Sequence, residues 1–536
     1  MQVDPPFALF WAAGASTPLA ETLFDDTFAG IHQLSWFDWA LLVPYFVTLS
    51  ILAVYGGHRY HTLWTYWRTR RDPAPHSSAR FPELPRVTIQ LPLFNERFVV
   101  GRLLEETLKI RYPKERLQIQ VLDDSTDETH PFTQALVARY RALGYPIEYH
   151  HRTNRHGFKA GALENGLATA TGEFIAIFDA DFLPPADFLE RTIPYFADPT
   201  VGLVQTRWTY LNREYNLLTE VQAMLLDGHF VLEHSARAAS GLFFNFNGTA
   251  GILRREMIRD AGGWQHDTLT EDSDLSYRAQ VRGWRFVYLP DIECPSELPT
   301  DMYSFQVQQA RWAKGLTQCA KKLLPVIWRS RIPWRNKVEA FFHLTPNLSY
   351  PLMIVVSVLM LPVMIVRFYM GWLEMLLIDF PLIVASFWSI AAFYLTAQRI
   401  LHPQRWWRAI ALMPALIAAG VALTLSNTKA VLEALLGVQT SFARTPKYAI
   451  RSAEPTKIAP AIYRRKSGWL PYVELAASAF FATMTLYAID TNNLLTIPFL
   501  LFFVAGYGWA GVATLLEEYR GKIAFEKART LAAQPD

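Results

Sequence analysis

Four groups of acidic, basic and aromatic side chains in this sequence could carry chemistry. The first is the pair Asp123 and Asp124, which follows an apolar run. Carboxylates at the end of a strand can accept hydrogen bonds from base N–H groups or ribose hydroxyls of a nucleotide. The same residues also favour a turn in which Asx side chains bond the backbone, so the pair alone leaves both interpretations open. Lys159 lies among small residues that open a helix, a setting that suits a diphosphate.

Two further acidic pairs follow along the chain. Asp179 and Asp181 are separated by one residue, directly after an apolar run at residues 174–178. Two such carboxylates can bind a hard divalent cation, Mg²⁺ or Mn²⁺, which completes its shell with phosphate oxygens and water. Glu271 and Asp272 form the third group, and an acid there could serve as general base on a sugar hydroxyl.

The fourth group is Gln308, Arg311 and Trp312, on an amphipathic pattern just ahead of a long apolar region. Arginine can offset the charge of a leaving diphosphate, and tryptophan offers a flat apolar face to a sugar ring. The competing interpretation is a basic and aromatic helix that lies on lipid. Both interpretations can hold for the same helix.

The scaffold that must position these groups is predicted from the intervening pattern. Residues 87–91, 117–122 and 174–178 are short β-rich runs that predict strands, and residues 99–110 predict an amphipathic helix. Alternation of this kind predicts an α/β domain with a mainly parallel sheet and helices on its faces. Ligands of such sheets bind at the C-terminal ends of the strands, where the acidic groups fall.

Composition predicts a membrane region beside this domain. Apolar residues make up 51% of the chain and charged residues only 18%, against roughly 25% charged in a soluble domain. Spans of sufficient length are predicted at residues 39–55, 347–367, 376–396, 469–488 and 494–514. The apolar run at 410–435 is interrupted by Asn427, Lys429 and Glu433, and therefore predicts an interfacial or re-entrant helix.

Charge predicts the orientation of these segments. No Lys or Arg precedes Arg59, which argues against a cleaved signal peptide. Basic residues then follow the first span at once, so the positive-inside rule places the N-terminus outside and the soluble domain in the cytosol. We expect a bacterial inner membrane. The net charge of +3 is too small to indicate a nucleic-acid partner, and the two cysteines predict free thiols.

The order and spacing of the four groups resemble the signature of processive family 2 glycosyltransferases, and more closely the plant cellulose-synthase-like A and C proteins than bacterial cellulose synthase. The resemblance is carried by Asp124, by Asp179 and Asp181, by Thr270-Glu271-Asp272, by Gln308 with Arg311 and Trp312, and by residues 90–96, 159–163, 246–251 and 261–264. The corresponding domains are residues 1–72 with one span, 85–335, 336–515 and a tail at 516–536.

The resemblance implies a Rossmann-like catalytic domain of the GT-A type that inverts the sugar in a single displacement. It implies roles for Asp123, Asp124, Lys159, Asp179 and Gln309 in binding a nucleotide sugar, for Asp179 and Asp181 in binding the metal, for Asp272 and Glu271 at the acceptor hydroxyl, and for Gln308, Arg311 and Trp312 at the diphosphate and acceptor end. Residues 441–448 resemble the gating loop of cellulose synthase, which adds Thr445 and Lys447 to the nucleotide-sugar site.

The leading hypothesis is therefore a polymerase of a β-1,4-glucan or mannan type. It would use UDP-glucose or GDP-mannose, a growing glycan acceptor, membrane lipid and accessory export subunits. One alternative is a lipid glycosyltransferase that adds a single sugar to ceramide or diacylglycerol. Another is a non-enzymatic transporter or scaffold, which the complete set of acidic residues argues against.

Overall fold

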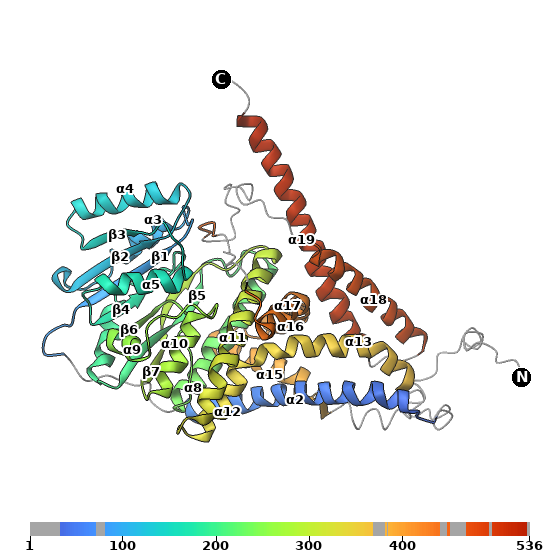
Figure 1. Cartoon of the computed structure of the whole chain (residues 1–536). Helices are drawn as coiled ribbons and strands as arrows, with labels where there is room; N and C mark the ends of the chain where they lie inside the picture. The colour runs from blue at the N-terminus through green and yellow to red at the C-terminus, as the bar shows by residue number, and fades with distance from the viewer. Residues whose placement is uncertain are drawn as a thin grey trace, which may run out of the picture.

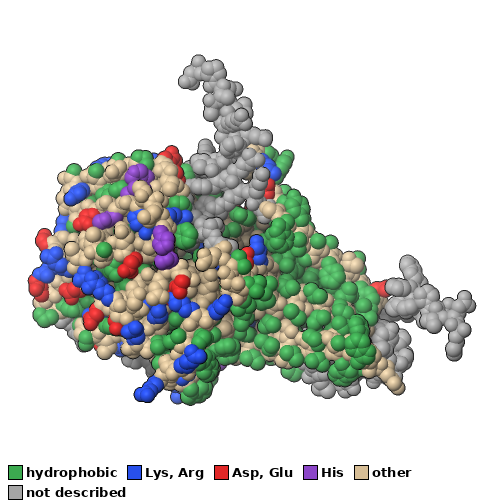
Figure 2. All heavy atoms as spheres, in the orientation of Figure 1, with side chains coloured by type: hydrophobic (Ala, Val, Ile, Leu, Met, Phe, Trp, Pro, Cys, Tyr) green, Lys and Arg blue, Asp and Glu red, His purple; other side chains and the backbone are tan. Residues whose placement is uncertain are grey.

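The structure is a computed structural model that describes residues 33–70, 81–367, 381–382, 384–439, 447–450, 468–491 and 496–532. It has two regions, an α/β domain and a set of long helices beside it (Figure 1). Hydrophobic side chains gather over the long helices, whereas Lys, Arg, Asp and Glu gather over the α/β domain (Figure 2). This division matches the predicted pairing of a soluble domain with a membrane region.

A mixed sheet forms the centre of the α/β domain. Its strands are β1 (Val87–Leu93), β2 (Leu117–Asp123), β3 (Ile147–His151), β4 (Phe174–Ile177), β5 (Val201–Tyr210), β6 (Gly251–Arg254) and β7 (Arg285–Ser296). Their order is β3-β2-β1-β4-β6-β5-β7. All neighbouring pairs are parallel except those of β6, which runs antiparallel to β4 and β5. The predicted α/β fold with a mainly parallel sheet is confirmed.

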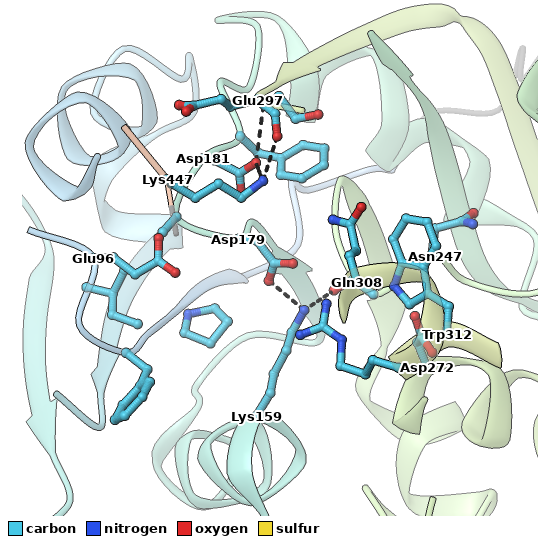
Figure 3. A pocket seen from close by; sticks show the side chains of 18 of the residues that line it. Glu96, Lys159, Asp179, Asp181, Asn247, Asp272, Glu297, Gln308, Trp312 and Lys447 are labelled. Atoms are coloured by element: carbon cyan, nitrogen blue, oxygen red, sulfur yellow. Dashed lines mark hydrogen bonds and ion pairs between the residues drawn. The ribbon is translucent and has the colours of Figure 1, made fainter. Parts of the chain in front are cut away.

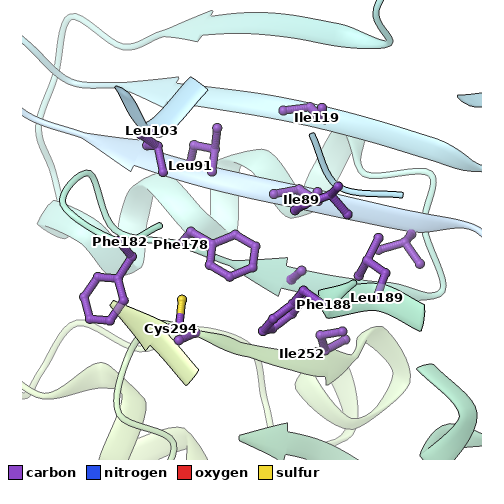
Figure 4. Packing of buried hydrophobic residues seen from close by; sticks show 14 of the residues in the cluster. Ile89, Leu91, Leu103, Ile119, Phe178, Phe182, Phe188, Leu189, Ile252 and Cys294 are labelled. Atoms are coloured by element: carbon purple, nitrogen blue, oxygen red, sulfur yellow. The ribbon is translucent and has the colours of Figure 1, made fainter. Parts of the chain in front are cut away.

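Both faces of the sheet are covered, which explains its apolar strands. Ile89, Leu91 and Phe178 pack on one face with Phe188 and Cys294 (Figure 4). On the other face, Leu122 of β2 and Ile175 and Ile177 of β4 belong to a second apolar cluster. Both cysteines are buried free thiols, as predicted.

Helices flank this sheet and continue into the second region. Those of the α/β domain are α3 (Val100–Thr107), α4 (Thr129–Ala142), α5 (Phe158–Thr169), α6 (Phe188–Thr192), α7 (Leu217–Asp227), α8 (Ser235–Ala239), α9 (Arg255–Asp260), α10 (Glu271–Val281), α11 (Met302–Arg329) and α12 (Trp334–Leu344), with short 3₁₀ turns at Lys114–Arg116 and Ile193–Ala197 and a π-helix, η4 (Gly228–His234).

A ladder of buried glutamines fixes α5, the helix that carries Lys159, to the sheet. Gln90 Nε2 donates to Gln120 Oε1 (3.0 Å), and Gln120 Nε2 donates to Thr169 Oγ1 at the end of α5 (3.0 Å). Gly166 lets α5 approach this ladder, because a Cβ there would lie 2.6 Å from Gln90 Nε2. The N-terminus of α5 is thereby held at the edge of the sheet where β1, β2 and β4 end.

The second region consists of α2 (Trp36–Thr69), a 3₁₀ turn (Pro346–Leu348), α13 (Ser349–Arg367), the π-helix η6 (Val384–Trp388), α15 (Ser389–Leu401), α16 (Arg408–Ala422), α17 (Thr424–Leu436), α18 (Leu470–Asp490) and α19 (Ile497–Ala532). Within the described residues, four helical segments are long and apolar enough to cross a membrane: Trp36–Thr69, Pro346–Arg367, Leu470–Asp490 and Ile497–Ile523. They overlap the predicted spans at 39–55, 347–367, 469–488 and 494–514.

Two membrane predictions have a different outcome. The predicted span at 376–396 begins outside the described residues, and its described part is helical from Val384, so it stays a prediction. The predicted helix at 410–435 is instead a pair, α16 and α17, that meet at a bend of 40°. A re-entrant loop and a broken span both have this shape, so the pair is compatible with the predicted re-entrant form.

Helix α11 joins the two regions. Gln306 Nε2 donates to Glu474 Oε1 of α18 (2.6 Å), and Lys314 Nζ donates to Glu433 Oε2 of α17 (2.8 Å). The first turns of α11 therefore rest on membrane helices, while its next turns reach the α/β domain.

Candidate active site

A pocket lies where β1, β2 and β4 end, and its wall includes the N-terminal turns of α5 and α10, one face of α11 and the ends of β5 and β7 (Figure 3). Ten predicted site residues line it: Asp124, Lys159, Asp179, Asp181, Glu271, Asp272, Gln308, Arg311, Trp312 and Lys447. Parallel strands present their carboxyl ends at one edge of a sheet, and this explains why the acidic pairs converge.

Two other predicted site residues, Asp123 and Gln309, do not line this pocket. Asp123 is buried, and its carboxylate accepts hydrogen bonds from the Tyr149 hydroxyl (2.6 Å) and the Ser125 amide (2.8 Å). It therefore holds the end of β2 in place rather than facing the pocket. Gln309 is not among the lining residues, and Thr445 lies outside the described residues.

Each of the two predicted metal-binding carboxylates forms an ion pair with a lysine. Lys159 Nζ donates to Asp179 Oδ1 (2.5 Å), and Lys447 Nζ donates to Asp181 Oδ2 (2.7 Å). Lys447 also donates to the backbone oxygen of Glu297 (2.5 Å). Two carboxylates that share a pocket and already hold cationic groups form a donor set that suits a hard divalent ion.

Asp124 forms a two-point ion pair with Arg152. Arg152 Nε lies 2.7 Å from Asp124 Oδ1 and Arg152 Nη2 lies 2.5 Å from Oδ2. Nearby, the guanidinium of Arg155 lies 3.3 Å from the ring centroid of Phe94, and both residues line the pocket. This end of the pocket therefore combines the Phe94 ring, the Arg155 guanidinium and a carboxylate, Asp124, that is paired with Arg152.

The opposite wall holds the predicted base. The Ser273 amide donates to Asp272 Oδ1 (2.6 Å) at the start of α10. Burial, reinforced by the neighbouring Glu271 carboxylate and opposed by Lys159, raises the pKa of Asp272 to about 7. Burial likewise raises the pKa of Glu271. A carboxylate with a pKa near neutrality is suited to accept a proton at the pH of a cell.

Arg311 supplies positive charge opposite these acids. Its burial lowers the pKa of the guanidinium from the usual value, and the carboxylates of Glu271 and Asp179 oppose that shift. Because an arginine stays protonated even so, the wall formed by α11 presents a cation together with the indole of Trp312.

The segment of residues 245–250 connects these parts. Thr249 Oγ1 accepts a hydrogen bond from the Asp179 amide (2.9 Å), and the Gly248 oxygen accepts one from Lys159 Nζ (2.9 Å). Gly248 has a φ of +80°, and a Cβ there would lie 2.9 Å from Asp272 Oδ2. Glycine is required here both for the backbone conformation and for the close approach of Asp272.

We expect Gly248→Ala to reduce catalytic turnover on the order of 100-fold, because the methyl group would displace Asp272, and small misplacements of reacting groups are that costly. Gly241→Ala is a matched control, since Gly241 has a φ of +66° but a Cβ added there would meet nothing within 4 Å. Thermal unfolding in detergent should show similar destabilisation of both variants. Equal turnover in the two variants would contradict the assignment.

Sequence reasoning missed several residues of this pocket. Arg155 lines the pocket and Arg152 pairs with Asp124, and both belong to a basic run after β3 that indicates an anion site. Glu297 accepts a hydrogen bond from the Tyr448 amide (2.8 Å), 151 residues away. No local pattern could have revealed that contact.

Three comparisons relate this chain to known proteins. Residues 85–315 match the family described as "Glycosyltransferase like family 2". Glucomannan 4-beta-mannosyltransferase 2 of Arabidopsis thaliana is 44% identical over 252 residues, which cover 46% of this chain and 47% of that protein. Glucomannan 4-beta-mannosyltransferase 1 of Oryza sativa subsp. japonica is 42% identical over 277 residues, covering 49% of this chain and 52% of that protein. The chain thus spans about half the length of the curated relatives it matches.

Among solved structures, the mannosyltransferase PcManGT from Pyrobaculum calidifontis, in complex with GDP-Man and Mn²⁺, is similar with a TM-score of 0.48 and 23% identity. The match covers 73% of this chain and all of that one.

Proposed function

We propose that this chain, whose residues 85–315 match glycosyltransferase family 2, is a membrane-embedded inverting hexosyltransferase of the GT-A type that polymerises a β-linked glucomannan or mannan. The observation that carries the proposal is the meeting of Asp124, Asp181, Asp272 and Trp312 in one pocket beside membrane helices. The glucomannan mannosyltransferases among its relatives support the choice of product.

In the proposed reaction, a single displacement, different side chains of the pocket assist the acceptor and the leaving group. Asp272 takes the proton of an acceptor hydroxyl, and the freed oxygen forms a bond to the anomeric carbon. The bond from that carbon to the diphosphate oxygen breaks on the opposite face, so the configuration inverts. Arg311 and Lys159 offset the negative charge that the leaving diphosphate takes with it.

The nucleotide end of the pocket would hold the leaving group. Phe94 with Arg155 would stack on the base, and Asp124 would accept hydrogen bonds from the nucleoside. Asp179 and Asp181 would hold a divalent cation, Mg²⁺ or Mn²⁺, which supplies charge neutralisation of the diphosphate when bound. Lys159 and Lys447 would then be released from these carboxylates and could contact phosphate oxygens.

The proposed acceptor end is the side of the pocket that α11 forms. Trp312 would stack on the terminal sugar ring. The contacts of α11 with α17 and α18 support an acceptor end beside the membrane region. The elongating product would leave there across a plasma membrane, bacterial by our expectation, with the catalytic domain on the cytosolic side. Membrane lipid and accessory export subunits are proposed partners.

The test is to incubate membranes that contain the protein with GDP-mannose and UDP-glucose, separately and together. We expect GDP-mannose to give a polymer that endo-β-1,4-mannanase degrades, and the mixture to incorporate glucose as well. Membranes that contain the Asp272→Asn variant are the control. A single glycolipid in the organic phase, with no polymer, would overturn this proposal and indicate a lipid glycosyltransferase instead.

A further inference from the structure

Two histidines of the first membrane helix and a glutamate of α12 bring three potential metal ligands together. His58 and His61 are one turn apart on α2, and Glu339 belongs to α12, which lies beside that end of α2 (Figure 1). One ligand atom from each side chain lies within 4.8 Å of the other two. None of the three residues lines the pocket described above. The cluster is therefore separate from the candidate active site.

The separations between these atoms fit a small tetrahedral ion. Zn²⁺ binds imidazole nitrogen and carboxylate oxygen at about 2.0 to 2.2 Å, so its ligand atoms lie roughly 3.3 Å apart. His58 Nε2 is already 2.9 Å from Glu339 Oε2. His61 is exposed, and its nitrogen needs to move by roughly 1.5 Å at most to complete the set, which a change of rotamer supplies.

Neighbouring side chains hold the other two ligands in place. The His58 ring stacks on Phe342 of α12, with ring centroids 4.2 Å apart and an angle of 12° between the planes. Arg237 Nε of α8 donates to Glu339 Oε1 (2.8 Å), while Glu339 Oε2 contacts His58. Hydrogen-bonded partners behind a ligand fix its orientation toward a metal ion. Two of the three ligands are thus already oriented.

The cluster is open to solvent on one side. Glu339 is only 5% exposed and His58 is partly buried, whereas His61 is exposed. Three protein ligands leave a fourth position for water, as in zinc sites that keep an open position. The cluster lies beside Arg59, the first basic residue of the chain, so the orientation expected from charge puts it at the cytosolic end of α2.

A plain ion pair between a protonated His58 and Glu339 is the competing interpretation. It uses only two of the three side chains and gives no role to the second histidine. The described residues contain one other cluster of this kind, Asp123 with His130 and His151. That cluster is the weaker candidate, because its two imidazole rings stack with centroids 3.9 Å apart and its carboxylate already accepts two hydrogen bonds.

We propose that His58, His61 and Glu339 bind one Zn²⁺ ion at the junction of α2 and α12. Imidazole ligands suit Zn²⁺, whereas Mg²⁺ prefers a set made of oxygen atoms alone. The ion joins the first membrane helix to the α/β domain, because Glu339 also holds Arg237 of α8. This site is distinct from the cation site proposed in the pocket, and the inference does not depend on the proposed function.

The experiment uses the full-length protein in detergent, purified without a histidine tag and stripped of metal with chelator. Co²⁺ serves as the spectroscopic probe, and excess Mg²⁺ is present to fill sites made of oxygen atoms. The wild type should show the visible absorption of tetrahedral Co²⁺ at one equivalent, and Zn²⁺ should abolish it. His61→Ala should weaken Co²⁺ binding roughly tenfold or more. His402→Ala is the matched control, since His402 is also exposed at the end of a helix, α15, but belongs to no metal cluster.

Two further measurements separate coordination from a structural role of His61. His61→Cys keeps a ligand, because thiolates bind such ions well, and it should add a near-ultraviolet sulfur-to-cobalt band that only direct coordination produces. Zn²⁺ should raise the unfolding temperature of the wild type but not that of His61→Ala, because an ion that binds only the folded state stabilises it. Without metal, the two proteins should unfold at similar temperatures.

Co²⁺ absorption that is absent from the wild type, or equal in the wild type and His61→Ala, would overturn the inference. Absorption that is lost in His130→Ala but kept in His61→Ala would place the ion at Asp123 and would also overturn it. Neither outcome affects the proposed polymerase, whose activity is measured separately by incorporation of sugar from GDP-mannose.

Discussion

Asp272→Asn is expected to reduce kcat on the order of 10³-fold, while the KM for the nucleotide sugar changes by less than about threefold. An amide has the shape of the carboxylate but cannot take a proton, and general base catalysis contributes about 10² to 10⁴ in rate. The Asp272 carboxylate accepts a hydrogen bond from the Ser273 amide and lies close to Gly248, which has no side chain.

The pH dependence gives an independent readout. Because Asp272 acts deprotonated and its pKa is about 7, wild-type kcat/KM should fall as the pH drops below 7 and level off above it. The raised pKa also means that the folded state binds more protons than the unfolded state between about pH 4 and 7. The free energy of unfolding therefore decreases as the pH rises through that range, and Asp272→Asn should be no less stable than the wild type at pH 8.

Asp274→Asn is the matched control, since Asp274 lies on the same helix and is fully buried, but pairs with Arg278 (2.7 Å) and Lys322 (2.9 Å) rather than lining the pocket. It should lower stability and leave the pH profile in place. A wild-type profile without the acidic limb, or Asp272→Asn with kcat within tenfold of the wild type, would exclude Asp272 as the base.

The parts of this architecture that the sequence predicted are those with a local pattern. β1, β2 and β4 are short β-rich runs, and acidic pairs lie at or just beyond the ends of β2 and β4, so these strand ends and the acidic pairs could be placed together. β6 is four residues long and pairs antiparallel with two strands distant in the chain. Such pairing depends on tertiary contacts that a short run does not encode.

The same limit applies to individual side chains. Adjacent residues at a strand end point to opposite sides, so the sequence could not decide which of Asp123 and Asp124 faces the pocket. His58 and Glu339 are ordinary polar residues until the fold brings their side chains to 2.9 Å. The type and spacing of paired acidic residues indicate a catalytic or metal site in the sequence itself. The residues that orient them can be recognised only from their side-chain contacts in the structure.

The second large loss of activity is expected when Asp179 or Asp181, the two carboxylates paired with lysines, is replaced. Asp179→Asn and Asp181→Asn should each lower metal-dependent turnover by roughly 10³-fold, because a lost metal contact costs several kcal/mol in the transition state. Chelator should have a similar effect on the wild type, and Mn²⁺ or Mg²⁺ should restore activity to the wild type but to neither variant. Membrane insertion, measured by extraction with alkali, should stay unchanged.

Lys447 provides the sharper test of this metal assignment. Its ammonium lies 2.7 Å from Asp181 Oδ2, so it competes with any divalent ion for that carboxylate. Lys447→Met should therefore lower the metal concentration needed for half-maximal hydrolysis of the nucleotide sugar by roughly threefold or more, since even the attraction of two charges in water is about 1 kcal/mol at this range. The same variant should reduce sugar transfer, because the lysine would no longer reach the diphosphate. Full activity in chelator, or a higher metal requirement in Lys447→Met, would contradict the metal assignment. Asp179 and Asp181 would then only form ion pairs with Lys159 and Lys447.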